Sequence, residues 1–403
     1  MSSRPIASSD VLSLNYIPTA TGAVGRTINA KLGDIVNVKD FGAVGDGVTD
    51  DTVAFQNAIN AAISAKTRLY APAGKYNVTS TLNFGASMSA FITGFEFFGD
   101  GDRADSTGNG TTIYYTGPST HTVINVNLYR YAYLHDFSVL CATAGAALYG
   151  VLVPDSQAGQ HRFARVMVQS ASRAFGQELG TGVNGEFYYF QSCYGKLVDE
   201  FWHNEAGQGY VHSFVNCLAT INPGGIFFNL NLSTGGGGID VFDFNGTALS
   251  PPTGNPNTTL VRSLNATSII NFIGGRIEHI TMLWSCPFSS YSSVQSVLFE
   301  GLEITYNNDL TDGTNTLRYT INDDTHFSII TVRGCKFEGQ TTRDTINVKD
   351  NGGPYAHISF DRCTFERIPS PVTVTPITNQ RFVDCLWISN STTQNLINAG
   401  SWT

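Results

Sequence analysis

Short apolar runs separated by polar and glycine-rich turns fill most of this 403-residue chain, and a clear helical pattern occurs once, near the N-terminus. Between Val53 and Ile63, apolar residues recur at helical spacing in a run that contains neither Gly nor Pro. This pattern predicts an amphipathic helix over about residues 50–65. The segment RLYAPAGKYNV follows, and its two short apolar runs around a Pro-Ala-Gly turn predict a pair of strands.

A motif of the form apolar-x-small/polar-apolar-x-apolar recurs beyond residue 130. Its ten copies start at residues 134, 163, 190, 214, 244, 272, 299, 332, 360 and 382, and successive starts lie 22 to 33 residues apart. This period suits one coil of a parallel β-helix, in which each strand pairs with the coil below at a spacing of about 4.8 Å. A leucine-rich repeat has a similar period, but its Leu-x-x-Leu-x-Leu signature is absent. We therefore expect an all-β fold, a parallel β-helix of about ten coils with an N-terminal capping α-helix.

The chain divides into three regions by pattern. Residues 1–36 are polar and too short to fold alone, and we expect them to form a leader or neck. Residues 37–90 hold the strand, helix and strand that would cap the β-helix, and residues 91–403 hold its coils. Within the last region, STGGGG from residue 233 and SPPTGNPNTT from residue 250 predict lateral loops, which can wall a groove and set specificity.

Cysteines share one position of the repeat. Five of the seven stand fourth in a motif copy: Cys193, Cys217, Cys335, Cys363 and Cys385. Other copies have Phe137, Val166 or Leu302 there, so the cysteines are expected to behave as small buried hydrophobic residues. Stacked side chains point in parallel and three consecutive cysteines cannot all pair, which predicts free thiols. No Cys-x-x-Cys or Cys/His cluster suggests zinc, and no metal or other cofactor is expected.

Composition narrows the classes of partner. The net charge is −9, and the 23 Lys and Arg residues form no cluster, which argues against binding to nucleic acid or to an anionic membrane surface. No apolar stretch approaches the roughly twenty residues that span a bilayer, and the start, MSSRPIASSD, lacks the pattern of a signal sequence. A soluble chain without membrane insertion is expected.

The acidic, glycine-rich stretch DFGAVGDGVTDDT at residues 40–52 has several interpretations. Asp46, Asp50 and Asp51 could bind calcium, although the terminal Glu of the usual loop is missing. The glycines resemble a phosphate-binding loop, but neither Gly-Lys-Ser/Thr nor Gly-x-Gly-x-x-Gly is present. A catalytic acid pair is a third interpretation. We favour a structural role, with Thr49 or Asp50 as the N-cap of the helix and the acidic side chains at the positive end of its dipole.

One segment carries a family resemblance. RTINAKLGDIVNVKDFGAVGDGVTDDTVAFQNAINAA, followed by LYAPAGKYNV, closely resembles the start of the pectate-lyase-like β-helix of bacteriophage tailspike proteins. The similarity covers about residues 26–80, and beyond them it rests on the repeat alone. It implies a right-handed β-helix that caps its N-terminal end with the helix and, as is typical of such spikes, a homotrimer. It also implies a place in the virion tail, attachment to a baseplate or tail protein through the N-terminal segment, and action at the host cell surface.

The resemblance implies a polysaccharide of the bacterial surface, a capsule or an O-antigen, as the ligand, but the fold alone cannot name the reaction. Three functions remain open: hydrolysis of that polysaccharide, lyase action on a uronic-acid polymer, and glycan binding by a structural tail component without turnover. Hydrolysis is the leading hypothesis and needs two carboxyl groups. The Asn-Thr-Asp and Gly-His-Gly motifs of polygalacturonases are missing, so pectin is not inferred as the substrate.

Candidate carboxylates fall on one strip. AFGQEL from residue 174 and FWHNEA from residue 201 take the same position in successive coils, which aligns Phe175 with Trp202, and Ile226 is aligned with both. If this apolar set faces inward, the ladder of Glu178, Glu205 and Asn229 three residues further on faces outward. Two stacked carboxylates would raise one pKa and provide an acid.

The same alignment selects the residues of a sugar groove. We expect Glu178 and Glu205 to be catalytic, and His203, Asn229 and Phe227 to bind substrate on the outward strip, with Trp202 packed in the core. A solvated face without a role is the alternative.

A second strip lies on the repeated motif itself. Arg276, Glu303 and Lys336 take its fifth position in consecutive coils, where their alternating charges suit stacked ion pairs. Glu278 and Glu303 are further catalytic candidates, because they could approach each other across neighbouring coils, and Arg276 is a further substrate-binding candidate. Arg276 and Lys336 also keep lyase action open, since that reaction needs a base and a cation beside a carboxylate.

The remaining acidic residues fall into two groups. Glu338 and Glu366 take the seventh motif position, where stacked like charges tend to shift a pKa and so point to function. Asp199, Glu200 and the pair at residues 323–324 are interpreted as solvated turn residues.

Overall fold

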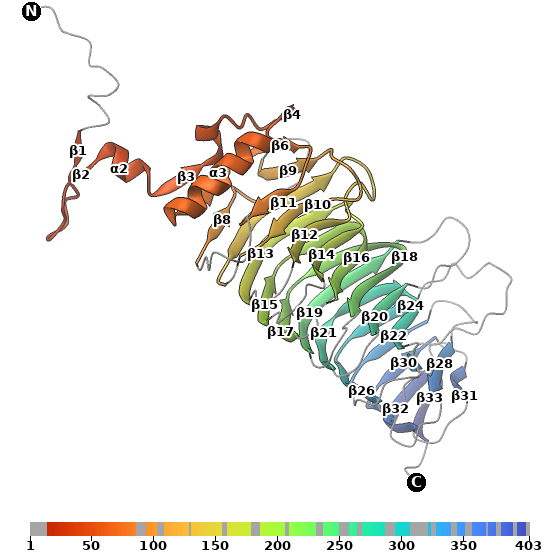
Figure 1. The fold of residues 1–403 in the computed structure, drawn as a ribbon. Coiled ribbons are helices and arrows are strands. Elements are labelled where there is room, and N and C mark those ends of the chain that lie inside the picture. The colour runs from red at the N-terminus through yellow and green to blue at the C-terminus, as the bar shows by residue number, and fades with distance from the viewer. Residues whose placement is uncertain are drawn as a thin grey trace, which may run out of the picture.

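Parallel strands wind into an elongated rod whose N- and C-terminal segments lie at opposite ends (Figure 1). This computed structural model describes residues 14–85, 94–102, 109–128, 130–154, 159–178, 186–205, 209–230, 237–249, 258–263, 268–286, 295–306, 321–323, 328–339, 345–350, 357–367, 370–375, 380–389 and 393–399. The expected all-β parallel β-helix with an N-terminal helix is confirmed. Three ladders of strands run along the rod.

The first ladder starts earlier than the sequence repeat, so the coil count differs from the expected ten. It contains β3 (Ile35–Asn37), β5 (Arg68–Tyr70), β8 (Glu96–Phe98), β11 (Tyr133–Cys141), β13 (Gly159–Gln169), β15 (Glu186–Gln191), β17 (Gly209–Val215), β19 (Gly237–Ala248), β21 (Ser268–Ile280), β23 (Gln295–Glu300), β26 (Ser328–Arg333), β29 (His357–Asp361) and β32 (Gln380–Ser389).

The second ladder uses the later parts of the long first-ladder strands as well as strands of its own. Its own members are β4 (Asp46–Asp50), β6 (Gly74–Val78), β9 (Thr111–Tyr115), the first parts of β16 (Tyr194–Asn204) and β18 (Leu218–Leu230), β24 (Glu303–Tyr306), β27 (Lys336–Glu338) and β30 (Thr364–Glu366).

The third ladder begins after the helix and carries Glu178 and Glu205 of the first candidate strip. It contains β7 (Leu82–Phe84), β10 (Thr122–Val126), β12 (Tyr149–Pro154), β14 (Arg173–Glu178), the later parts of β16 and β18, β20 (Thr259–Ser263), β22 (Met282–Cys286), β25 (Ile321–Asp323), β28 (Thr345–Asp350) and β31 (Ser370–Thr375). At the C-terminal end β33 (Thr393–Ala399) pairs antiparallel with β32.

The sequence motif marks the corner between the first and second ladders. Its third residue has a left-handed backbone, with φ between +49° and +70°, at Asp136, Arg165, Ser192, Asn216, Asp243, Gly274, Gly301, Gly334, Arg362 and Asp384. Asp, Asn and Gly tolerate this conformation best, which explains the small or polar third position. Nine of the ten expected motif starts are confirmed by the strand register. The fifth is wrong, because Phe214 pairs with Val241 and the copy therefore begins there and not at residue 244.

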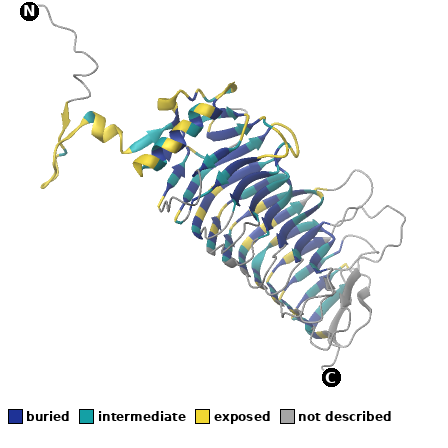
Figure 2. Cartoon of the chain, viewed as in Figure 1, coloured by how far each residue is buried: buried dark blue, intermediate teal, exposed yellow. Residues whose placement is uncertain are grey.

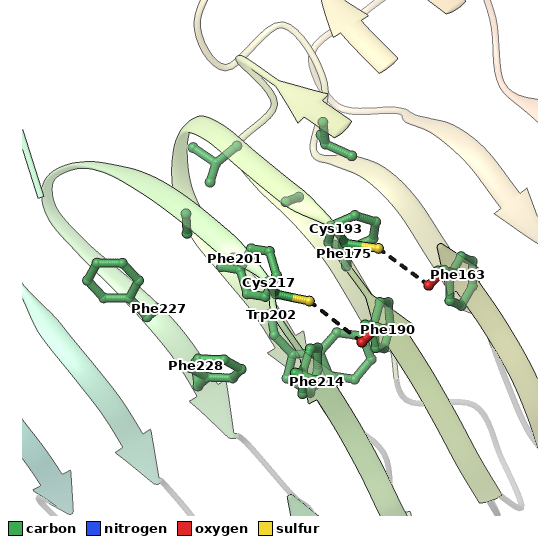
Figure 3. Packing of buried hydrophobic residues seen from close by; sticks show 14 of the residues in the cluster. Phe163, Phe175, Phe190, Cys193, Phe201, Trp202, Phe214, Cys217, Phe227 and Phe228 are labelled. Atoms are coloured by element: carbon green, nitrogen blue, oxygen red, sulfur yellow. Dashed lines mark hydrogen bonds between the residues drawn. The ribbon is translucent and has the colours of Figure 1, made fainter. Parts of the chain in front are cut away.

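The fourth motif residue turns back into the core, as expected for the cysteines. All seven cysteines are buried and free, which confirms the prediction of free thiols. Cys193 donates to the carbonyl of Phe163 at 3.5 Å, and Cys217 donates to that of Phe190 at 3.6 Å. Both hydrogen bonds are drawn as dashed lines in Figure 3. Each thiol therefore bonds to the preceding coil while its side chain fills the corner.

Aromatic side chains stack along the interior. The rings of Phe163 and Phe190 are 4.9 Å apart and those of Phe190 and Phe214 are 4.6 Å apart, both nearly parallel. Buried residues run along the rod, whereas the N-terminal segment is exposed (Figure 2). That segment consists of the hairpin of β1 (Asn15–Tyr16) and β2 (Arg26–Thr27) and the short helix α2 (Ile28–Leu32), which buries no residue.

The acidic stretch at residues 40–52 begins in the short 3-10 helix η1 (Val38–Phe41), contains strand β4 and leads into helix α3 (Thr52–Ala65). The N-cap is Asp51, not Thr49 or Asp50, and its carboxylate accepts hydrogen bonds from the amides of Val44 at 2.7 Å and Gly45 at 3.0 Å. The charge is structural, as favoured from the sequence. Phe55 of α3 is fully buried against the first coils, so the helix covers the N-terminal end of the core (Figure 1).

Candidate functional site

The outer face of the third ladder brings carboxylates together on neighbouring rungs. Phe175 pairs with Trp202, and the amide of Glu205 donates to the carbonyl of Gln177 at 2.8 Å. Trp202 is fully buried, as expected. Glu178 and Glu205 therefore occupy matching places at the ends of successive rungs, in the alignment that the sequence predicts.

His203 lies between two carboxylates. Its Nδ1 contacts Oε2 of Glu200, and its Nε2 lies 2.8 Å from Oε1 of Glu205. The imidazole is only 3% exposed, whereas the side chain of Glu205 is 27% exposed. Both ring nitrogens are donors when the imidazole is protonated, so His203 can link the two carboxylates. The contact fixes the orientation of Glu205, whose side chain stays partly open to solvent.

Glu200 is held from several sides. Arg173 Nε lies 3.4 Å from its Oε2, and Asn229 Nδ2 donates to its Oε1 at 2.9 Å. Burial acts to raise the pKa of Glu200, but the hydrogen bond from His203 and the charges of His203 and Arg173 outweigh it and hold the pKa below its ordinary value. Glu200 is therefore ionised at neutral pH and anchors its neighbours.

Tyr149, at the start of β12, contacts Arg173 and completes the group of side chains around His203 and Glu200. Arg173 Nη1 donates to the Tyr149 hydroxyl at 2.6 Å, and the guanidinium lies over the ring at 5.0 Å. Burial raises the pKa of Tyr149 well above its ordinary value, and the carboxylates of Glu178 and Glu205 add to this effect against Arg173. Both glutamates are therefore close enough to act on one hydroxyl. We call Tyr149, Arg173, Glu200, His203, Glu205 and Asn229 the His203 cluster.

A glycine allows the tyrosine to approach. A Cβ atom at Gly176 would lie 2.2 Å from Cε1 of Tyr149 and 3.1 Å from the carbonyl oxygen of His203. No side chain fits between the ring and the strand. Gly176 thus positions Tyr149 against the cluster.

The expected alignments of Ile226 with Trp202 and of Asn229 with Glu205 are wrong. Trp202 pairs with Phe228, and Ile226 pairs with Glu200, because the register shifts twice between Lys196 and Glu200. Asn229 consequently lies beside His203 and not beside Glu205, and it is 5% exposed.

Phe227, expected to bind sugar, is fully buried among the core residues drawn in Figure 3. It packs edge-on against Phe244 at 5.8 Å. The reason is that each of these rungs begins with two consecutive inward residues, so the two-residue alternation does not apply there. Such pairs are Ala174–Phe175, Phe201–Trp202 and Phe227–Phe228.

The interpretation of Glu200 as a solvated turn residue is also wrong, since its side chain lies in β16 and is 15% exposed. The signal for it was the sequence EFWHNE, in which an acid stands on each side of the histidine. Asp199 accepts hydrogen bonds from Ser172 at 2.8 Å and Asn222 at 2.9 Å, so it too is paired. Of the pair at 323–324, residue 324 lies outside the described residues.

The second strip forms stacked ion pairs. Arg276 pairs with Glu303 and Glu303 with Lys336 along the second ladder. Arg276 Nε lies 3.0 Å from Oε1 of Glu278 and 3.9 Å from Oε2 of Glu303, and Lys336 Nζ lies 3.1 Å from Oε2 of Glu366. The candidate carboxylates Glu278 and Glu303 therefore share one arginine, as the ion-pair interpretation requires.

Two general features concern the described part of the chain as a whole. Within it, no group of three or more His, Cys, Asp or Glu side chains is arranged to hold a metal ion. Among the same residues no helix is long and apolar enough to cross a membrane.

Comparison with known proteins places the fold in a class. Residues 35–130 match the family model described as rhamnogalacturonase A/epimerase, pectate lyase-like. A segment of 44 residues is 61% identical to mannuronan C5-epimerase AlgE5 of Azotobacter vinelandii, and one of 59 residues is 42% identical to the tail spike protein of an Escherichia phage. These segments cover 11% and 15% of this chain, but only 4% and 7% of the relatives' own lengths.

The whole rod has a structural counterpart. A tailspike protein mutant of E. coli bacteriophage HK620, solved in complex with a pentasaccharide, matches with a TM-score of 0.65 at 12% identity, over 96% of this chain and 72% of that chain. The fold is thus a pectate-lyase-like parallel β-helix. More narrowly, it is the β-helix fold of phage tailspike proteins.

Proposed function

We propose that this chain is a tailspike depolymerase that binds and hydrolyses a bacterial surface polysaccharide, a capsule or an O-antigen, at the outer face of β12, β14, β16 and β18. The observation that carries the proposal is the arrangement around His203, where one carboxylate is held ionised and a second, Glu205, is oriented and open to solvent beside Glu178 of the preceding rung.

The two outer glutamates take the roles that glycoside hydrolysis requires. In the proposed reaction Glu178 donates a proton to the glycosidic oxygen as the bond to the anomeric carbon breaks. Glu205 stabilises the positive charge that develops on the sugar and takes up the proton lost by the incoming water. Among the described residues Glu178 has no cationic partner, whereas the contact with His203 holds Glu205 in one orientation.

The buried members of the cluster act by positioning. His203 and Asn229 were expected to contact substrate, but at 2% and 5% exposure they serve better to hold Glu200 and Glu205 in place. Arg173 and Tyr149 complete that support. Glu278, Glu303 and Arg276 form the alternative site, on the second ladder.

The proposal extends to the assembly. We place the protein in the virion tail as a homotrimer that acts at the host cell surface and is attached through its N-terminal segment to a baseplate or tail protein. Exposed apolar side chains in that segment favour a partner there: Ile17 is 68%, Val24 79% and Leu32 66% exposed.

Lyase action on a uronic-acid polymer is the second candidate function. It is favoured by Arg173, whose side chain is 24% exposed on this face, since a guanidinium can neutralise a sugar carboxylate. The similarity of the N-terminal segment to a mannuronan epimerase points to the same class of polymer.

The test incubates the protein with purified capsules and lipopolysaccharides from a panel of encapsulated bacteria. New reducing ends alone support hydrolysis, an unsaturated product that absorbs ultraviolet light supports lyase action, and binding without shortening supports a structural glycan-binding component. Glu178→Gln and Glu205→Gln should each abolish cleavage and leave the melting transition intact, with Glu300→Gln on the first ladder as the matched control. If Glu278→Gln or Glu303→Gln abolishes cleavage instead, the site lies on the second ladder.

A further inference from the structure

A hollow lies on the outer face of the first ladder, away from the third-ladder strands that carry the His203 cluster. Its volume is about 470 Å³, within the range of roughly 300–1,000 Å³ that is usual for sites of small ligands. Side chains from three successive rungs line it: Tyr131, Tyr133, Gln160, Arg162, Phe187 and Tyr189. Four of these six are aromatic, which sets this hollow apart from the acidic third-ladder face.

The aromatic rings present apolar faces at fixed places. Tyr131 is 50% and Tyr189 is 40% exposed. Tyr133, Arg162 and Tyr189 are direct register partners on consecutive rungs, so they lie in one column. The ring of Tyr133 is fixed by stacking on His135 at 4.2 Å. Rigid rings with a polar edge suit a pyranose, whose C–H face packs on an aromatic ring while its hydroxyl groups reach polar side chains.

Arg162 adds a charge that the hollow does not neutralise. Its guanidinium lies over the ring of Tyr189 at 5.6 Å, and within the described residues no carboxylate lies at ion-pair distance from it. Arg165 on the same strand differs, because it binds both oxygens of Asp136 at 2.5 and 2.7 Å. The nearby Glu96 is occupied by His135 at 3.2 Å and Arg68 at 3.8 Å. A guanidinium in this state is suited to bidentate binding of a carboxylate.

We infer that this hollow binds a carboxylate-bearing sugar residue of an acidic polysaccharide, with the pyranose ring against Tyr133 and Tyr189 and its carboxylate on Arg162. The inference rests on the proposed function, which makes the ligand a bacterial surface polysaccharide. It adds that this polysaccharide contains sugars that carry a carboxylate. It also separates a holding site on the first ladder from the cleavage site on the third, so that a long polymer is retained between cleavage events.

The test uses an array of purified bacterial surface polysaccharides, each immobilised in its native form and in a carboxyl-reduced form. Reduction turns each sugar carboxylate into an alcohol and leaves the rest of the chain unchanged. Binding is measured for the natural sequence and for Arg162→Gln, Tyr189→Ala and, as the control, Arg362→Gln. Arg362 is also an exposed arginine, and it lies near the C-terminal end of the rod. Far-ultraviolet circular dichroism and thermal melting check that each variant is folded.

We expect the natural protein to bind native acidic polysaccharides and to lose at least about tenfold in affinity on carboxyl reduction. Loss of a charged hydrogen bond is worth about 1.5–3 kcal/mol, so Arg162→Gln should weaken binding by about tenfold or more, whereas Arg362→Gln should bind like the natural protein. Equal binding of native and reduced forms, unchanged binding by Arg162→Gln, or no bound acidic polysaccharide would each overturn the inference.

Cleavage measured in parallel separates the two proposals. Glu205→Gln should bind the array as the natural protein does but release no reducing ends. If it still cleaves while Arg162→Gln loses binding, the cleavage site is wrong and the hollow stands. If it fails to cleave while Arg162→Gln binds normally, the hollow alone is wrong.

Discussion

Acidification should lower the free energy of unfolding of the β-helix because two histidines lie buried in its interior. His161 and His212 are 0% and 1% exposed, and they lie on either side of Tyr188, at ring distances of 5.6 and 4.9 Å. Burial lowers the pKa of His161 to about 4 and that of His212 to about 3. Both rings are therefore neutral in the folded protein at pH values at which the unfolded chain carries the charge.

The size of the effect follows from the two pKa shifts. In the unfolded chain each histidine titrates near pH 6.5, so between about pH 6 and pH 4.5 the unfolded state binds roughly one more proton per histidine. Each extra proton lowers the free energy of unfolding by about 1.4 kcal/mol per pH unit. This contribution to stability is complete above about pH 6.5 and is lost as the pH falls towards 4 for His161 and 3 for His212.

The assay compares urea unfolding of the natural protein and His212→Phe between pH 5 and pH 6.5, followed by fluorescence. Phenylalanine keeps a ring against Tyr188 and Trp202, whose ring lies 5.2 Å from that of His212, but it does not titrate. Its stability should depend less on pH, by about 1.4 kcal/mol per pH unit between pH 5 and 6. The carboxylates titrate in both proteins and cancel in the difference. Equal slopes in the two proteins, or the same change in the exposed control His121→Gln, would refute the reasoning.

Three further outcomes can be measured. Gly176→Ala should push Tyr149 from the His203 cluster and lower cleavage by tenfold or more, with a loss of about 1–3 kcal/mol in the free energy of unfolding; wild-type cleavage would contradict the arrangement. Phe227→Ala should cost about 3–5 kcal/mol in urea unfolding and leave glycan binding intact, whereas weaker binding at unchanged stability would restore it as a sugar contact. Thiol titration of the denatured, unreduced protein should find seven free groups, and a clearly lower number would contradict the free thiols.

The fold was largely predictable, because a β-helix repeats its constraints at each coil. The corner needs a residue that accepts a left-handed backbone, followed by one that fits the interior, and this pair is visible in the sequence as Ser192–Cys193 or Asn216–Cys217. The motif did not identify the first three strands of the first ladder, β3, β5 and β8. Their connections differ from the later ones, since the helix and the acidic turn are inserted between β3 and β5.

The placement of Glu178 beside Glu205 was predictable for a similar reason. The contacts that hold Glu205 and His203 in place were not predictable. Glu178 and Glu205 follow Phe175 and Trp202 at equal spacing, so the rung register alone places them together. Arg173 and Tyr149 stand at the start of their strands and show no distinguishing pattern there. Only the register and the space above Gly176 bring them to His203.

The errors at β18 have one physical source. A slip of one residue in a strand exchanges its two faces, but a slip of two residues preserves them, so Asn229 kept its outward side while its partner changed from Glu205 to His203. The prediction that Phe227 faces outward was wrong for another reason. Each of these rungs begins with two consecutive residues that face the core, so inward and outward side chains do not alternate there. The same local break puts Glu200 back on the outer face beside His203, three residues earlier. The pair of consecutive inward residues therefore has two effects. It places Phe227 in the core, outside the proposed site, and it places the ionised Glu200 beside His203 within that site.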